Sequence, residues 1–265
     1  MRQKSRGIAL LVLVVVLLVI VSSRVSPQRD YTSSGRVRTT DDPYYDTDVP
    51  QTFELPTPAT PTPAMKIQEA IPGITPNDWN LRLVNNTYVL SNSFAPDVSE
   101  IVSGSAQYFD SRAVDALRSM IAAAEEAGYT VNIRNAYRPY STQAYIFFGR
   151  ASQIQWGTDM EMIEAEAIAR ESVAYPGTSE HQLGLGVDLM DSPNTTMDSE
   201  TAAQIPVLQW LTEHCDEYGF ILRYPADKEE ITGWYEPWHF RYVGEDCAAY
   251  IMENGLCLEE FISMF

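Results

Sequence analysis

The stretch SEHQLGLGVD, residues 179–188, combines a histidine, two closely spaced glycines and a carboxylate. Read as an extended segment, it places Gly184, Gly186 and Asp188 on one face and only leucine and valine side chains on the other. The apolar face predicts a short strand, 185–190, packed on a core. The opposite face carries little side-chain volume beside its carboxylate, which leaves room for an ion or a ligand.

A second stretch, YEPWH at residues 235–239, contains another of the three histidines of the chain. Pro237 lacks an N–H and favours extended geometry at Glu236, so this segment is not a helical metal-binding motif. The remaining histidine, His214, lies in a segment with helical periodicity, 204–218, and is predicted to bind no metal.

The two stretches together contain the groups that a zinc hydrolase needs. Such an enzyme requires three protein ligands, an open position for water and a carboxylate that takes a proton from that water. His181, Asp188 and His239 would supply the ligands, and Glu236 would supply the base. On spacing alone an alternative stays open, in which the histidines only satisfy local hydrogen bonds and the glycines mark a bulge. Asp191 is a weaker rival to Asp188, because it falls on the other face of the strand.

These motifs resemble the SxHxxGxAxD and ExWH pair of VanY-type D-alanyl-D-alanine carboxypeptidases, zinc peptidases related to lysostaphin-like enzymes and hedgehog domains. The resemblance extends over residues 79–263. One position departs from the family pattern, where Gly186 replaces an alanine. The matching blocks occur in the expected order and comprise residues 83–85, 136–143, 175–179, 219–225, 231–233 and 236–244.

The resemblance implies one zinc per domain, bound by His181, Asp188 and His239, with Glu236 as the general base. It also implies that Arg138 reads the terminal carboxylate of a substrate, a task that suits a bidentate guanidinium.

Three further residues are expected to line the same site. Gln143 would lie in the first turn of a helix that begins after Ser141, where free N–H groups favour an anion. Ser179 and Trp238 line the site by resemblance. Structural alternatives stay open: Arg138 in an ion pair, Ser179 in a turn and Trp238 in the core. Two other arginines in matched blocks, Arg223 and Arg241, are expected to form scaffold salt bridges.

The function implied by the resemblance is removal of the last D-alanine from peptidoglycan stem peptides. One alternative keeps the chemistry but cuts the L,D bond of tetrapeptide stems, and a less favoured alternative is a non-catalytic module of hedgehog type. Arg138 favours an exopeptidase, because an endopeptidase meets no terminal carboxylate. No ligand or base of the motifs is missing, which disfavours the non-catalytic module.

The charge of the chain limits its partners. Eighteen lysines and arginines stand against 36 acidic residues, a net charge of −18, and the basic residues are concentrated near the N-terminus. An acidic domain repels phosphate backbones, so we expect no nucleic-acid partner. An anionic substrate must therefore be captured by local cations. The sequence indicates no obligate protein partner.

The N-terminal region is expected to be an export signal followed by a linker. Basic residues precede an uninterrupted apolar run from Ile8 to Val21, and we interpret residues 1–23 as an uncleaved signal anchor, with a cleaved signal peptide as the alternative. The positive-inside rule then places the rest of the chain outside a cell membrane. Residues 24–78, rich in proline and threonine, are predicted to form an extended linker before a domain at 79–265.

The domain is predicted to be α+β, a small mixed or antiparallel sheet with flanking helices and a mononuclear zinc site. Three cysteines are too few for a disulfide framework, and Cys247 and Cys257 either pair or remain buried thiols. Periodicity and capping predict helices at 111–127, 142–152, 160–173, 204–218, 245–253 and 258–264, and strands at 129–134, 185–190, 220–223 and 240–243.

Overall fold

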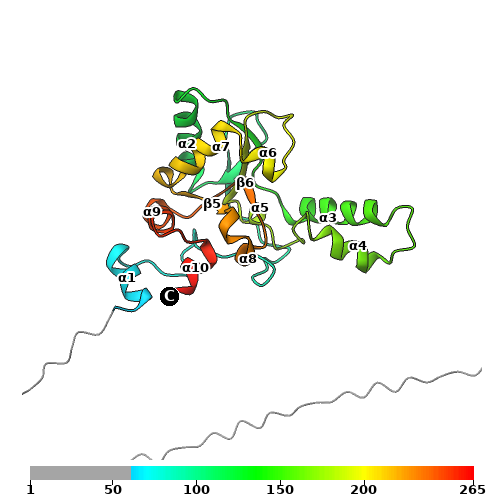
Figure 1. Cartoon of the computed structure of the whole chain (residues 1–265), viewed down its shortest axis with the longest axis horizontal. Helices are drawn as coiled ribbons and strands as arrows, with labels where there is room; N and C mark the ends of the chain where they lie inside the picture. The colour runs from blue at the N-terminus through cyan, green and yellow to red at the C-terminus, as the bar shows by residue number, and fades with distance from the viewer. Residues whose placement is uncertain (1–60) are drawn as a thin grey trace, which may run out of the picture. The chain divides into compact units, whose positions relative to one another are not determined.

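The computed structural model describes residues 61–265 (Figure 1). The expected signal anchor, 1–23, and most of the expected linker lie outside these residues. Between residues 61 and 265 no helix is both long enough and apolar enough to cross a membrane.

Two antiparallel sheets form the centre of the domain, as the α+β expectation requires. The larger sheet has the strand order β3-β4-β6-β5, and the smaller one pairs β1 with β2. All strand pairs are antiparallel. The strands are β1 Val98–Glu100, β2 Tyr108–Asp110, β3 Asn132–Asn135, β4 Gly186–Met190, β5 Phe220–Tyr224 and β6 Glu236–Tyr242.

Helices surround the larger sheet, and two buried clusters hold them to it. The first cluster joins α2 and α7 to β4, whose predicted apolar side chains are buried in it. The second joins α1, α9 and α10 to Ile221 and Val243. Because Phe220 enters the first cluster and Ile221 the second, the clusters lie on opposite faces of β5. The helices are α1 Pro63–Ala70, α2 Val114–Glu126, α3 Tyr140–Gln155, α4 Met162–Ala169, α5 Glu180–Leu183, α6 Ser199–Ala202, α7 Pro206–His214, α8 Glu229–Thr232, α9 Glu245–Glu253 and α10 Leu258–Ser263.

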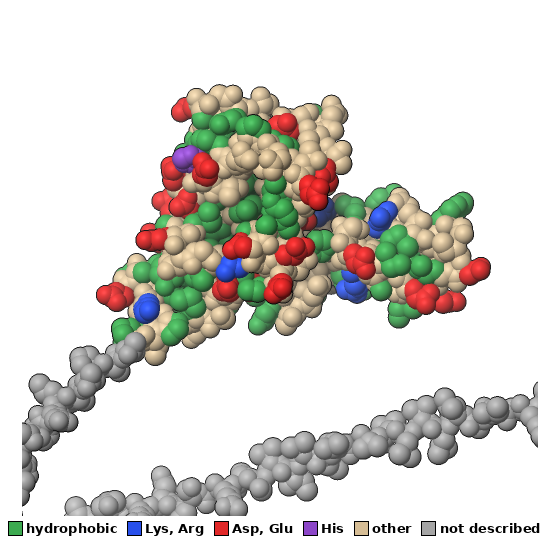
Figure 2. Space-filling model, viewed as in Figure 1, with side chains coloured by type: hydrophobic (Ala, Val, Ile, Leu, Met, Phe, Trp, Pro, Cys, Tyr) green, Lys and Arg blue, Asp and Glu red, His purple; other side chains and the backbone are tan. Residues whose placement is uncertain are grey.

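The pair α3 and α4 projects from the rest of the domain (Figure 1) and has a small core of its own, built from Phe147, Ala151, Ala165 and Ala169. The surface of this projecting part shows apolar side chains (Figure 2). Trp156, the residue that follows α3, is 88% exposed. The base of the pair contributes side chains to the site described below.

The structure corrects the expected boundary between linker and domain. The end of the expected linker folds as α1, because Thr62 caps the helix and Pro63 occupies its first turn. Ile67 of this helix is fully buried in the second cluster, so these residues belong to the domain. Proline in the first turn favours a helix, whereas the repeated prolines earlier in the linker do not.

A second correction concerns Gly184, which does not lie on the strand with Gly186 and Asp188. It ends the short helix α5 in a left-handed conformation with φ 77°, which favours glycine. The strand begins two residues later, at Gly186. Of the two alternatives for the cysteines, the structure has buried thiols: Cys215, Cys247 and Cys257 are all buried and form no disulfide.

Candidate functional site

Strand register brings the two motifs together. Asp188 on β4 lies directly opposite His239 on β6, and Gly186 lies opposite Arg241. Opposed residues of an antiparallel pair have neighbouring side chains, so two groups 51 residues apart in the chain meet. His181 reaches the same place from α5. The backbone carbonyl of His181 accepts a hydrogen bond from the backbone N–H of Arg138 at 3.0 Å.

Three of the predicted residues form a compact cluster of possible metal ligands. His181, Asp188 and His239 are buried, and one donor atom from each lies within 4.8 Å of the others. His181 Nε2 is 3.2 Å from one Asp188 oxygen, and His239 Nδ1 is 2.8 Å from the other. The opposite nitrogen of His181, Nδ1, hydrogen-bonds the Ala136 carbonyl at 2.9 Å, which orients Nε2 towards Asp188.

The charges in this cluster suit a cation. Burial lowers the pKa of His181, so its imidazole is neutral at pH 7. Burial raises the pKa of Asp188, but the two histidines outweigh that effect and hold it well below its usual range. Two imidazole nitrogens and one carboxylate oxygen are a donor set that zinc accepts. These residues therefore fit a zinc ion.

Binding of a zinc ion to His239 would displace a proton from its imidazole. Burial lowers its pKa, but the hydrogen bond to Asp188 and the nearby carboxylates of Glu180 and Glu236 raise it to about 9. Without a cation, the Nδ1–H of His239 donates to the ionised Asp188 at 2.8 Å. A metal ion needs the same lone pair, so binding of the ion would release this proton.

Glu236 lies beside the cluster with one oxygen 3.8 Å from His239 Nδ1, and a quarter of its side chain is exposed. Removal from water raises its pKa to about 7, assisted by the negative charges of Asp188 and Glu180 and opposed by His239 and Arg138. A carboxylate that titrates near neutrality is suited to accept and return a proton.

A cavity of about 300 Å³ opens onto the cluster. Arg138 lies in its wall, and within residues 61–265 its Nε is buried without a hydrogen-bond partner. Burial lowers the pKa of this guanidinium, against the raising effect of Asp188 and Glu236. The cavity brings together all eight residues singled out from the sequence, namely Arg138, Gln143, Ser179, His181, Asp188, Glu236, Trp238 and His239.

The remaining lining residues differ in how they are held. Gln143 donates to the Ala174 carbonyl at 2.7 Å, and its own carbonyl oxygen has no partner in the described part of the chain. Trp238 lines the cavity and also packs in the first core cluster. His214 lies outside the cavity and hydrogen-bonds Glu217 at 2.8 Å.

Three residues at the site were missed by sequence reasoning. Asn135 donates a hydrogen bond to Asp188 at 2.7 Å, and the ring of Tyr224 packs 5.0 Å from that of His239. Glu180 is fully buried between His239 and the ion pairs of Arg223 and Arg241. The sequence offered one signal for each of them, namely its position inside or next to a stretch that resembles the family. The ion pairs confirm the scaffold role expected for the two arginines.

Comparisons with known proteins agree with this site. Residues 106–245, more than half of the chain, match the family model described as VanY, D-alanyl-D-alanine carboxypeptidase. The chain is 38% identical over 190 residues to the putative carboxypeptidase YodJ of Bacillus subtilis, a match that covers 68% of this chain. It is 35% identical over 187 residues to a D-alanyl-D-alanine carboxypeptidase of Enterococcus faecalis, over 70% of this chain. The matches span 66% of each relative, just under two thirds of its length.

Solved structures show the same fold. A mutant of the vancomycin-resistance D,D-pentapeptidase VanY in complex with Zn(II) matches with a TM-score of 0.59 and 35% identity, over 70% of this chain and 99% of that one. The LD-carboxypeptidase LdcB matches with a TM-score of 0.58 and 37% identity, over 69% of this chain and 85% of that one. The resemblance drawn from the motifs is confirmed, and the chain belongs to the VanY family of D-alanyl-D-alanine carboxypeptidases.

Proposed function

We propose that the chain is a zinc-dependent carboxypeptidase that removes the C-terminal D-alanine from peptidoglycan stem peptides. Family membership supports this activity, and a family structure in complex with Zn(II) supports the metal. The fit of His181, Asp188 and His239 to a zinc ion supports one metal per domain.

The observation that carries the proposal is the position of Arg138. Its guanidinium lies in the wall of the cavity that also contains the metal-ligand cluster and Glu236. Among residues 61–265 no carboxylate pairs with it. The cost of removing this guanidinium from water is offset only in part by the negative charges of Asp188 and Glu236, and the terminal carboxylate of a peptide would pair with it directly. The cut is therefore directed to the last residue of the substrate.

The residues of the chain divide the reaction between them. Zinc, when held by His181, Asp188 and His239, would polarise the peptide carbonyl and acidify water. Glu236 takes the proton of the attacking water and returns it to the leaving amine. Arg138 binds and orients the terminal carboxylate, which fixes the scissile bond within reach of Glu236.

Cleavage of the L,D bond of tetrapeptide stems is the second candidate, and the 37% identity to LdcB favours it. Both substrates end in a free D-alanine carboxylate, so Arg138 does not discriminate between them. The difference lies in the configuration of the preceding residue.

Incubation of the purified chain with pentapeptide and tetrapeptide stems tests the proposal. We expect mass spectrometry to show loss of one alanine from the pentapeptide, and little change in the tetrapeptide. Cleavage of the tetrapeptide alone would replace the D,D activity with the L,D activity. No cleavage of either stem by zinc-loaded protein would contradict both.

The proposed place of action is outside the cytoplasmic membrane, since peptidoglycan lies there. The apolar run from Ile8 to Val21 supports export, either as a retained anchor or as a cleaved signal. N-terminal sequencing of the protein recovered from membranes and from the medium distinguishes the two.

The pKa of Glu236 predicts how activity depends on pH. The base must be ionised to take a proton, so kcat/KM should fall tenfold per pH unit below its pKa. Burial raises this pKa from 4.5 to about 7, and a bound cation brings it down from there. We therefore expect an acid limb with a midpoint between these two values.

Steady-state kinetics across the pH range, with the zinc content followed at each pH, checks this expectation. The metal measurement is needed because protonation of the ligands also removes activity at low pH. A flat profile across that interval, with zinc retained, would contradict the role of Glu236.

A further inference from the structure

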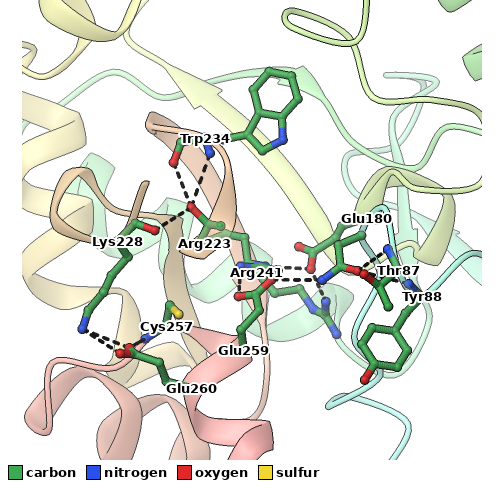
Figure 3. A network of polar contacts seen from close by, with 12 residues as sticks. Thr87, Tyr88, Glu180, Arg223, Lys228, Trp234, Arg241, Cys257, Glu259 and Glu260 are labelled. Atoms are coloured by element: carbon green, nitrogen blue, oxygen red, sulfur yellow. Dashed lines mark hydrogen bonds and ion pairs between the residues drawn. The ribbon is translucent and has the colours of Figure 1, made fainter. Parts of the chain in front are cut away.

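Glu180 is a buried carboxylate next to the metal-ligand cluster, with no part in the mechanism above. It directly precedes His181, and its side chain is fully buried. One oxygen, Oε1, accepts hydrogen bonds from Arg223 Nε at 2.8 Å and Arg241 Nη1 at 2.7 Å. Figure 3 shows Glu180 held in this network.

The second oxygen, Oε2, faces His239. It lies 3.6 Å from His239 Nε2, and neither atom has a hydrogen-bond partner within residues 61–265. A buried donor or acceptor without a partner is costly, so two complementary groups that face each other are expected to pair. Gly186 leaves the space for this: a Cβ there would stand 2.9 Å from His239 Nε2 and 3.2 Å from Glu180 Cβ.

We propose that Glu180 is a positioning residue, which accepts the Nε2–H of His239 and so leaves the lone pair of Nδ1 for the metal. Each imidazole nitrogen has its role set by the hydrogen bond that the other makes. This inference rests on the metal centre of the proposed function. Nδ1 of His239 lies within 4 Å of Asp188 and Glu236, whereas the carboxylate within 4 Å of Nε2, in the part of the chain that the structure describes, is that of Glu180.

The two arginines fix which oxygen of Glu180 faces His239. Arg241 lies two residues after His239 on β6, and its Nη2 donates to the carbonyls of Asn80 and Arg82. Arg223 on β5 binds Glu259 through both of its terminal nitrogens, at 2.9 and 2.6 Å. Both guanidinium groups are thus anchored elsewhere, and both can only donate. They hold Oε1 of Glu180 and leave Oε2 for the imidazole.

This arrangement makes Glu180→Gln a sharp test, because the change keeps the size of the side chain. The arginines hold the amide carbonyl in place of Oε1, so the NH2 group must take the place of Oε2. An NH2 group donates, and it therefore favours the imidazole tautomer whose Nε2 accepts and whose Nδ1 carries the proton. That proton occupies the position of the metal.

Zinc affinity of the full chain, measured at neutral pH by competition with a chromophoric chelator, is the first readout. Glu180→Gln should weaken zinc binding by roughly 10–100-fold, the usual loss when an outer partner of a ligand is removed. The matched control is Glu259→Gln, which also removes a carboxylate from Arg223 but does not touch His239. The control should bind zinc almost as tightly as the unmodified chain.

The imidazole nitrogens provide a second readout that does not depend on a variant. The chain has only three histidines, so 15N-histidine labelling yields few imidazole signals. In the zinc-loaded, unmodified chain, His239 should show a slowly exchanging proton on Nε2. A proton on Nδ1 instead would overturn the proposal, even if Glu180→Gln fails to fold.

The outcomes separate this inference from the function on which it rests. A wild-type chain that binds no zinc would overturn both. Tight zinc binding by the wild type with equal affinity in Glu180→Gln would overturn the role of Glu180 alone. Equal weakening in Glu180→Gln and Glu259→Gln would show that the network only supports the fold, and would also overturn it.

Discussion

Glu236→Gln should keep one zinc per chain and lose roughly 10²–10⁴-fold in kcat, the usual contribution of a general base. The amide has nearly the same shape as the carboxylate, and Glu236 belongs to none of the three ligand positions. The site should therefore keep its metal and its substrate affinity. An amide accepts no proton at neutral pH, so the water must attack the peptide carbonyl without a base. Zinc content by elemental analysis and single-turnover kinetics measure the two effects separately.

A matched control shows whether the loss is specific to the cavity. Glu230 lies exposed on α8, six residues before Glu236 and outside the cavity, so Glu230→Gln removes the same charge and should leave kcat unchanged. If Glu236→Gln retains a rate close to that of the wild type while carrying zinc, another group takes the proton.

A drop in both zinc content and rate would have a different meaning. Glu236 would then belong to the metal ligands. The donor atoms that cluster as possible metal ligands come from His181, Asp188 and His239 and not from Glu236, which argues against this.

The metal ligands and the base were predictable because they stand in two short segments, 179–188 and 235–239. Alternation along 185–189 requires only local geometry, and the structure buries the apolar side chains that it predicts. Asp188 and His239 are far apart in the chain, so their pairing is not a local feature. It follows from the register of β4 and β6, because a shift by one residue would turn the apolar side chains of one strand away from the core. Two motifs with complementary ligand types were therefore enough to predict one metal site.

The parts that sequence reasoning missed depend on contacts between distant segments. Glu180 precedes a predicted ligand, yet its role becomes apparent only where Arg223 and Arg241 meet it from β5 and β6. Ile67 reads as part of a linker until α9 and α10 cover it. Gly184 shares the spacing of a strand with Gly186, and only its φ of 77° reveals the end of a helix. Residue patterns record periodicity, whereas these features follow from tertiary packing.

Arg138→Lys should lower kcat/KM for a stem peptide with a free C-terminus by roughly tenfold to somewhat over a hundredfold. A lysine keeps the charge but cannot offer two parallel donors to one carboxylate. The loss of one charge-assisted hydrogen bond costs about 1.5–3 kcal/mol, which corresponds to that range. The unpartnered Nε of Arg138 at the cavity wall is the donor whose loss we expect to matter most.

The same variant measured on an amidated stem peptide separates substrate recognition from support of the fold. An amide lacks the negative charge that Arg138 reads, so the wild type should cleave it poorly and Arg138→Lys should lose little further. Arg134→Lys is the matched control, because the Arg134 guanidinium donates to the carbonyls of Ser192 and Thr195. It should penalise both substrates alike. Equal penalties from Arg138→Lys on the free acid and the amide would mean that Arg138 supports the scaffold, and the exopeptidase reading would then lose the cation that directs cleavage to the last residue.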